Sequence, residues 1–277
     1  MKLTQKIHLL KIDFEIAISP EKKLPRFVNV ILVFGDKITL IDSGVKGSEE
    51  KIRDYIEEQN RDFAEIDTLI LSHSHPDHIG SAARIKELTG CKIWAHEAEK
   101  EWIENIEIQN QQRPVPGFFN LVDRSVKIDE FISDGQELLI DDDVTLKFIH
   151  SPGHSKGSVN IEFVEDQILF TADSIPLKND IPNYDNFSNL MDSLDKISNA
   201  KFDRLLSSWT APLNDKTETD KLIEEGKAYM QTIDSVVKEC YGNTGNPDSC
   251  KLAVGKLGLP LFLANHIVDK AFRSHLN

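Results

Sequence analysis

The segment His73-Ser74-His75-Pro76-Asp77-His78 places four side chains that can bind a metal ion within six residues. It follows an apolar run at residues 68–71 that predicts a buried strand, and it precedes a predicted helix at about residues 79–88. Residues two apart in an extended loop point the same way, so the first two histidines are expected to face one ion. The aspartate and the last histidine of the segment are then expected to face a second ion. A polar surface loop is the plain alternative, which three of the chain's nine histidines in one short window disfavour.

Two other places on the chain offer ligands of the same kind. His154 lies in the turn Ser151-Pro152-Gly153-His154-Ser155-Lys156-Gly157, after a predicted strand, and Asp173 follows the apolar run at residues 168–170. Taken singly, a lone histidine is more often structural than a ligand, and an aspartate after a strand is commonly a helix cap or a turn former. Taken together with the histidine-rich loop, their order and spacing match one known pattern.

That pattern resembles the metallo-β-lactamase superfamily. The resemblance covers most of residues 25–212, and it includes Leu40-Ile41-Asp42-Ser43-Gly44 and the strand end Thr171-Ala172-Asp173. It implies an α/β fold, the αββα metallo-β-lactamase sandwich, with two β-sheets face to face, helices outside and the metal site along one sheet edge. Beyond Asn214 the residue pattern predicts helices only. We therefore predict a metallo-β-lactamase-fold domain at residues 1–214 and a C-terminal helical subdomain, or helical extension, at residues 215–277.

The resemblance also implies ligands for two metal ions. It assigns the first ion to His73, His75 and His154, the second to Asp77 and His78, and the carboxylate shared by both to Asp173. Asp42 matches an acid that orients a ligating imidazole in the family. Alternatively, Asp42 is an ordinary acidic residue of a hairpin turn. The nitrogen and oxygen donors suit zinc, as one or two ions, and leave iron or manganese open. His96 and His150 match positions that often carry histidine without binding metal, so neither is placed in the site.

One position departs from the family pattern. Relatives with a complete second site carry a last histidine after a short strand downstream of the bridging aspartate, where this chain has Trp209. An indole offers a hydrogen-bond donor and no lone pair for a metal. His266, the next histidine, lies in the helical tail and does not fit the spacing. We therefore expect a metal content nearer one than two; in the alternative, Trp209 is a core or rim aromatic and water or another side chain completes the second site.

The resemblance implies a hydrolase in which a metal-bound hydroxide attacks an acyl or phosphoryl centre. Asp77 is the candidate catalytic residue, because it can orient the water or accept its proton when no second ion holds it. We expect a small acyl substrate, namely a thioester, a lactone or another carboxylic ester, as in the glyoxalase II-like and thioesterase members. Two alternatives stay open. One is a phosphodiesterase, and the other is a degenerate member that binds a metal or metabolite without turnover.

Composition limits the partners. The 277 residues include 32 Lys and Arg against 46 Asp and Glu, a formal net charge of −14, so no basic face for nucleic acid or anionic lipid is expected. The charged N-terminus lacks an apolar window long enough for an export signal or a membrane anchor. Cys91, Cys240 and Cys250 show no C-x-x-C spacing, which favours reduced thiols. We expect a cytoplasmic protein with a small-molecule partner.

Substrate-binding residues are largely unknown from the sequence, with three aromatic candidates. Phe118 and Phe119 follow Pro114 and Pro116 in a stretch of poor periodicity and could form an apolar wall, or simply a loop that covers the core. Trp209 is the third candidate. The helical tail at residues 215–277 is expected to cover the metal cleft and contact substrate, or else to serve as a packing or homodimer appendage.

Overall fold

The computed structural model describes residues 1–17, 23–242 and 247–276. Alternating apolar and polar residues predict a first strand at residues 7–18, and its last residue, Ile18, lies outside the described ranges. Six strands form a first sheet in the order β1-β2-β3-β4-β5-β6, with β1 to β3 antiparallel and β3 to β6 parallel. The strands are β1 (Ile7–Ala17), β2 (Lys23–Phe34), β3 (Ile38–Ile41), β4 (Ile66–Ile70), β5 (Lys92–His96) and β6 (Glu130–Ile132).

A second sheet of five strands has the order β11-β10-β9-β8-β7. Its pairs are antiparallel except for β10 and β11, which run parallel. A parallel pair needs a crossover connection, and α7 supplies it here. The strands are β7 (Glu137–Asp141), β8 (Val144–His150), β9 (Val159–Phe163), β10 (Ile168–Phe170) and β11 (Arg204–Leu206).

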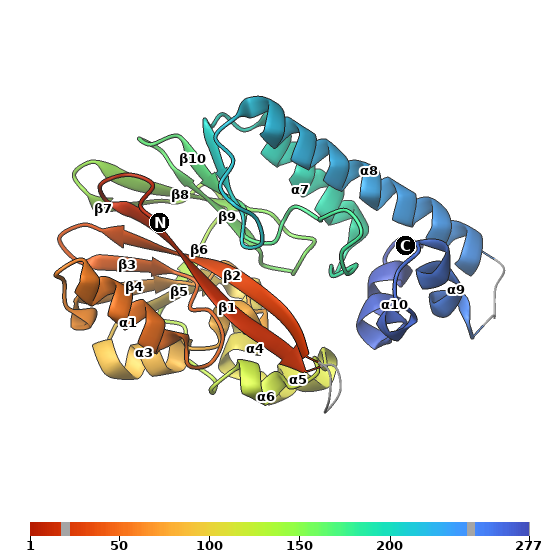
Figure 1. Ribbon diagram of the computed structural model, residues 1–277, viewed down its shortest axis with the longest axis horizontal. Helices are drawn as coiled ribbons and strands as arrows, with labels where there is room; N and C mark the ends of the chain where they lie inside the picture. The colour runs from red at the N-terminus through yellow and green to blue at the C-terminus, as the bar shows by residue number, and fades with distance from the viewer. Residues whose placement is uncertain (18–22, 243–246, 277) are drawn as a thin grey trace.

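Helices cover the outer faces of both sheets (Figure 1). Beside the first sheet are α1 (Ser48–Glu58), α2 (Pro76–Ile79), α3 (Ala82–Thr89), α4 (Lys100–Glu104), α5 (Ile106–Gln112) and α6 (Phe118–Leu121), with the 3-10 helices η1 (Phe63–Glu65) and η2 (Glu97–Glu99). Beyond the second are α7 (Phe187–Asn199), α8 (Lys216–Tyr241), α9 (Ser249–Lys256), η3 (Leu261–Leu263) and α10 (His266–Arg273). Within the described ranges, none of the helices combines the length and apolar character needed to cross a membrane.

The buried side chains separate into three layers of core, which is the arrangement expected of an αββα sandwich. In β2, Val30 and Leu32 face the core under the outer helices, whereas Ile31 and Val33 face the core between the two sheets. A strand buried on both faces reads as a continuous apolar run, as β2 does. The third layer lies between the second sheet and the C-terminal helices. The expected fold class is confirmed.

The C-terminal helices share that third layer of core with α7. Leu194 of α7, Met230 and Ile233 of α8, and Phe272 of α10 are all buried in it. Figure 1 shows α8 running along α7, with α9 and α10 near its far end. The division of the chain at residue 214 stays a prediction, and these packing contacts cross it.

Strand register brings the polar loop residues to one edge of the sandwich. Ile41 pairs with Ile70 across β3 and β4, so Asp42 and the histidine-rich loop leave the first sheet side by side. In the second sheet, Phe170 pairs with Leu206 across β10 and β11. Because polar groups beyond the carboxyl ends of parallel strands meet at the same edge, these loops form one site.

Candidate metal centre

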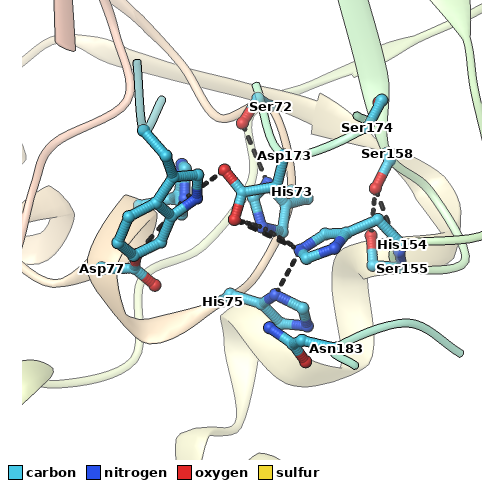
Figure 2. A network of polar contacts seen from close by, with 12 residues as sticks. Ser72, His73, His75, Asp77, His154, Ser155, Ser158, Asp173, Ser174 and Asn183 are labelled. Carbon is cyan, nitrogen blue, oxygen red and sulfur yellow. Dashed lines mark hydrogen bonds and ion pairs between the residues drawn. The ribbon is translucent and has the colours of Figure 1, made fainter. Parts of the chain in front are cut away.

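Three imidazoles converge at this edge, around the carboxylate of Asp173 (Figure 2). Nε2 of His154 lies 2.8 Å from Nδ1 of His75 and 3.2 Å from Nε2 of His73. Oδ2 of Asp173 lies 3.4 Å from the same nitrogen of His154. These four residues form a group whose ligand atoms all lie within 4.8 Å of one another. The structure therefore brings together the side chains expected at the first metal.

The three imidazoles are held in the neutral form that binds metals. Burial lowers the pKa of His73 and of His75 well below the usual value, and positive charge on neighbouring residues lowers both further. Burial likewise lowers the pKa of His154 to about 4. Near neutral pH these rings therefore carry lone pairs and no charge.

A second group consists of Asp77, His78 and Asp173. Nε2 of His78 lies 3.3 Å from Oδ1 of Asp173 and 3.6 Å from Oδ2 of Asp77. Burial opposes charge on His78, but the carboxylates of Asp173 and Asp42 raise its pKa well above the usual value. Burial would raise the pKa of Asp173, yet the charge on His78 outweighs it and lowers that pKa. Burial raises the pKa of Asp77.

These donors fit a divalent metal. In the described part of the chain, Nε2 of His78, Oδ2 of Asp77 and Oδ1 of Asp173 are buried and make no well-aligned hydrogen bond, although His78 and Asp173 form an ion pair at 3.3 Å. Leaving such groups unsatisfied costs about 1–3 kcal/mol each. The ring nitrogen of His154 faces those of His73 and His75 at 3.2 and 2.8 Å, and a cation bound between the three rings would engage a lone pair of each. A nitrogen and oxygen set of this kind is typical of zinc and of related transition metals.

Asp42 connects the two metal groups through hydrogen bonds. Its Oδ2 lies 2.8 Å from Nδ1 of His78, and it accepts a hydrogen bond of 2.8 Å from the hydroxyl of Ser72. The same hydroxyl lies 3.0 Å from Nδ1 of His73. Asp42 has a positive φ of 61°, a left-handed conformation that its short polar side chain tolerates. It occupies the place expected of an acid that orients ligating imidazoles.

Glu99 is a structural partner of the site that sequence reasoning missed. Its buried carboxylate accepts hydrogen bonds from the backbone N–H of Ser74, at 3.0 Å, and from the hydroxyl of Ser155, at 2.7 Å. It also accepts one from the N–H of Gly157. Glu99 thus ties the histidine-rich loop to the turn that carries His154. No local motif marks it, because its partners lie 25 to 58 residues away in the chain.

Two glycines allow this turn to approach its neighbours. Gly153 has a φ of +131°, and a Cβ there would lie 2.3 Å from the backbone nitrogen of Leu190 in α7. A Cβ at Gly157 would lie 2.8 Å from Cγ of Glu99. The Pro-Gly-His-x-x-Gly pattern therefore reflects close packing of the turn between α7 and Glu99.

Trp209 lies beside Asp173 at the sheet edge. Each is the third residue after its strand, and those strands, β10 and β11, pair in parallel with Phe170 opposite Leu206. The backbone around Trp209 is held independently of the indole, because the side-chain amide of Asn29 donates to the carbonyls of Ser207 and Thr210 at 2.9 Å each. Trp209 therefore stands near the second group without being able to bind a metal there.

Replacing Trp209 with histidine is expected to raise the metal content from near one equivalent toward two. The new imidazole would add a strong nitrogen donor to Asp77, His78 and Asp173, on a backbone whose anchors do not involve the side chain of residue 209. Elemental analysis of Trp209→His, beside Trp209→Phe as the aromatic control, measures the difference. Equal metal content in the two variants, or two ions already bound by the natural chain, would count against an incomplete second site.

A cavity of about 500 Å³ opens onto the metal groups, and Asp77, His154, Asp173 and Trp209 all contribute to its lining. Phe118 and Phe119 do not line it, so this part of the expected substrate wall is wrong. Phe118 packs into the core under the first sheet, and Phe119 is 51% exposed. The two aromatics lie in a short helix, α6, and point away from the cavity. The residues just before α6 line the cavity instead.

Three of the other five histidines are His96, His150 and His266, which lie outside both metal groups. His96 and His150 stack on each other, with ring centroids 4.1 Å apart. His266 lines the cavity but joins neither group of candidate ligands found among the described residues. The geometry agrees with leaving all three out of the ligand set.

Comparison with known proteins gives relatives named as hydrolases. The chain is 29% identical over 148 residues to the hydroxyacylglutathione hydrolase GloC of Haemophilus influenzae, covering 52% of this chain and 65% of that protein. It is 26% identical over 142 residues to the probable metallo-hydrolase YqgX of Bacillus subtilis, covering 51% of this chain and 63% of that one. The matches thus span less than two thirds of the length of these curated relatives.

A solved structure shares the fold along nearly the whole chain. It is that of the metallo-beta-lactamase family protein TTHA1429 from Thermus thermophilus, with a TM-score of 0.73, 17% identity, and coverage of 99% of this chain and 93% of that chain. Residues 24–213, well over half of the sequence, match the family described as the metallo-beta-lactamase superfamily. With the His/Asp cluster in place at the sheet edge, this chain belongs to the metallo-beta-lactamase superfamily.

Proposed function

We propose that the protein is a metal-dependent hydrolase of a small acyl substrate, namely a thioester, a lactone or another carboxylic ester. The observation that carries this proposal is the cavity, which joins the His/Asp cluster to largely apolar walls. An apolar pocket with a few convergent polar groups is the usual form of a small-molecule site. The name of the Haemophilus influenzae relative, hydroxyacylglutathione hydrolase, supports hydrolysis of an acyl compound.

The ligand residues have distinct roles in this proposal. His73, His75 and His154 would hold the ion with Asp173, and zinc is the metal that suits them best, with iron or manganese as alternatives. A divalent ion bound there supplies a Lewis acid and lowers the pKa of water toward about 7. Asp77 lies in the cavity wall with an unpaired buried oxygen, so it can orient water or accept a proton from it.

The helical tail supplies part of the substrate wall. Met230 and Ile233 of α8 and Val268 of α10 line the cavity together with residues of the β1–β2 hairpin such as Phe14. Trp209 adds an aromatic surface close to the metal groups. We therefore assign the tail a role in substrate binding, with no metal ligand among its described residues.

Trp209 also favours a second candidate function, in which the protein binds a metal or metabolite without turnover. An indole beside Asp173 removes a donor from the second group and fills part of the cleft. Hydrolysis of phosphodiesters is less well supported, because the net charge of −14 disfavours polyanionic substrates. We further propose a cytoplasmic protein that binds neither nucleic acid nor membranes and that is able to form a homodimer.

Steady-state assays with metal-loaded protein against thioesters, lactones and phosphodiesters separate these functions. We expect turnover of at least one acyl class, with no cleavage of structured RNA at physiological salt. Turnover of phosphodiesters alone would replace the acyl proposal, and a metal-loaded chain inactive on the whole panel would favour the binding protein.

A further inference from the structure

A buried arginine that belongs to neither metal group lies in the wall of the same cavity. Arg113 follows α5 directly and is 8% exposed. It lines the cavity together with Asp77, His154 and Asp173. A guanidinium cannot lose its charge in a protein, so this side chain brings a permanent positive charge to the edge of the metal groups.

The hydrogen-bonding capacity of Arg113 is largely unused. A guanidinium has five N–H donors. The Arg113 guanidinium donates a single hydrogen bond among the described residues, to Oδ1 of Asn183 at 2.6 Å. No carboxylate of the described residues lies within ion-pair distance of it. The other cavity arginine, Arg26, is committed, because it pairs with Asp180 at 3.0 Å and lies over the ring of Trp209. Of these two arginines, Arg113 is therefore the one with donors to spare for a ligand.

The electrostatic balance around Arg113 depends on the metal groups. Burial lowers its pKa, and the carboxylates of Asp185 and then Asp77 oppose that shift. Its charge in turn lowers the pKa of His75. A cation held by Asp77 and Asp173 would neutralise carboxylates that now balance Arg113. Asp185 alone would then offset this costly buried charge, so a ligand anion would be favoured beside Arg113.

We propose that Arg113, held in position by Asn183, binds a carboxylate carried by the acyl part of the substrate, close to the bond that is cleaved. The proposal rests on the acyl hydrolase function proposed above and narrows it to acids with a second carboxylate. A planar, singly charged carboxylate suits one guanidinium fork, whereas a phosphate dianion calls for more positive charge than a single guanidinium supplies. The apolar walls then contact the uncharged remainder of the substrate.

Two matched pairs of probes test this assignment on metal-loaded protein. The first pair is glutarate and pentanoate, which both have five carbons and differ only in the second carboxylate, with binding measured by calorimetry. The second pair is their N-acetylcysteamine thioesters, with kcat/KM measured after subtraction of spontaneous hydrolysis. The variants are Arg113→Gln and Arg113→Lys, and Arg124→Gln is the control. Arg124 is an exposed arginine that pairs with Glu87.

We expect the natural chain to prefer glutarate and glutaryl thioester by about 10- to 100-fold, the range typical of a hydrogen-bonded charge. Arg113→Gln should abolish that preference while changing affinity for pentanoate by less than about threefold. Arg113→Lys, which keeps the charge, should retain part of it, and Arg124→Gln should retain all. An unchanged preference in Arg113→Gln, or an equal loss for both probes, would overturn the proposal and leave Arg113 as a structural link to Asn183.

The two readouts separate this inference from the proposed function. Arg113-dependent binding of glutarate without turnover of any thioester would support the anion site and contradict the hydrolase. Turnover of both thioesters without an Arg113-dependent preference would support the hydrolase and contradict the anion site. If Arg113→Gln fails to fold, the preference measured in Arg113→Lys decides the matter, because a structural link alone predicts no change in the ratio of the two probes.

Discussion

Replacing His154 with alanine is expected to leave the first group without metal and to lower kcat/KM for any hydrolysis about a thousandfold or more. His154 is the ring that lies within 3.2 Å of both other imidazoles, so its loss removes the centre of the donor set. Two imidazoles and Asp173 would remain, which is a poorer site for zinc. Elemental analysis after dialysis and an assay on the best substrate of the panel measure both effects.

His150→Ala is the matched control for that variant. His150 belongs to the same segment, at the end of β8, but stacks on His96 outside the metal groups. The His150→Ala variant should therefore keep its metal and most of its activity. Full metal content in His154→Ala would show that the ion does not use this imidazole, and equal losses in both variants would point to damage of the segment as a whole.

Deleting residues 215–277 is expected to abolish folding of the remaining chain. Leu190, Leu194 and Ile197 of α7 are buried in the core that α8 and α10 share, and the deletion would expose them. Exposure of each costs about 1.5–3 kcal/mol, against a total stability of about 5–15 kcal/mol for a typical domain. The turn at Gly153 also packs on Leu190, so the support of His154 would be lost with the core.

Circular dichroism and thermal unfolding of the shortened chain measure this effect. A chain ending after His275 is the control, because it keeps the contact of 2.6 Å between that residue and the hydroxyl of Tyr184. A folded 1–214 fragment that retains its metal would contradict the expected dependence. That result would instead support an independent helical subdomain.

The metal groups could be anticipated from the sequence because their residues come in short local motifs. His73, His75 and His78 lie within six residues, and Asp173 follows a buried strand by three residues, so their order and spacing match the family pattern that implies a shared site. The strands were also predictable, since their apolar patterns are strong. The position of Trp209 near the second group stays a prediction, which the parallel pairing of β10 and β11 supports because it preserves the offset from each strand end.

Other parts of the site were not predictable because they depend on contacts between distant segments. Glu99 has no local signal, although it joins the two metal-binding loops. No sequence motif marks Arg113 as a site residue. Only the structure shows that it is buried and lines the cavity together with Asp77. Phe118 and Phe119 suggested an apolar wall, but aromatic content does not reveal which way a four-residue helix turns its side chains. Tertiary packing decided each of these cases.

The most direct test of the account is a metal titration of chelator-treated protein, with thioester hydrolysis measured after each addition of zinc. We predict no hydrolysis without metal, a rise in rate that follows the first bound equivalent, and no recovery in His154→Ala. Hydrolysis at the full rate by metal-free protein would contradict a metal-dependent mechanism at this cluster. A saturated first group without hydrolysis of any ester or thioester would contradict the proposed reaction.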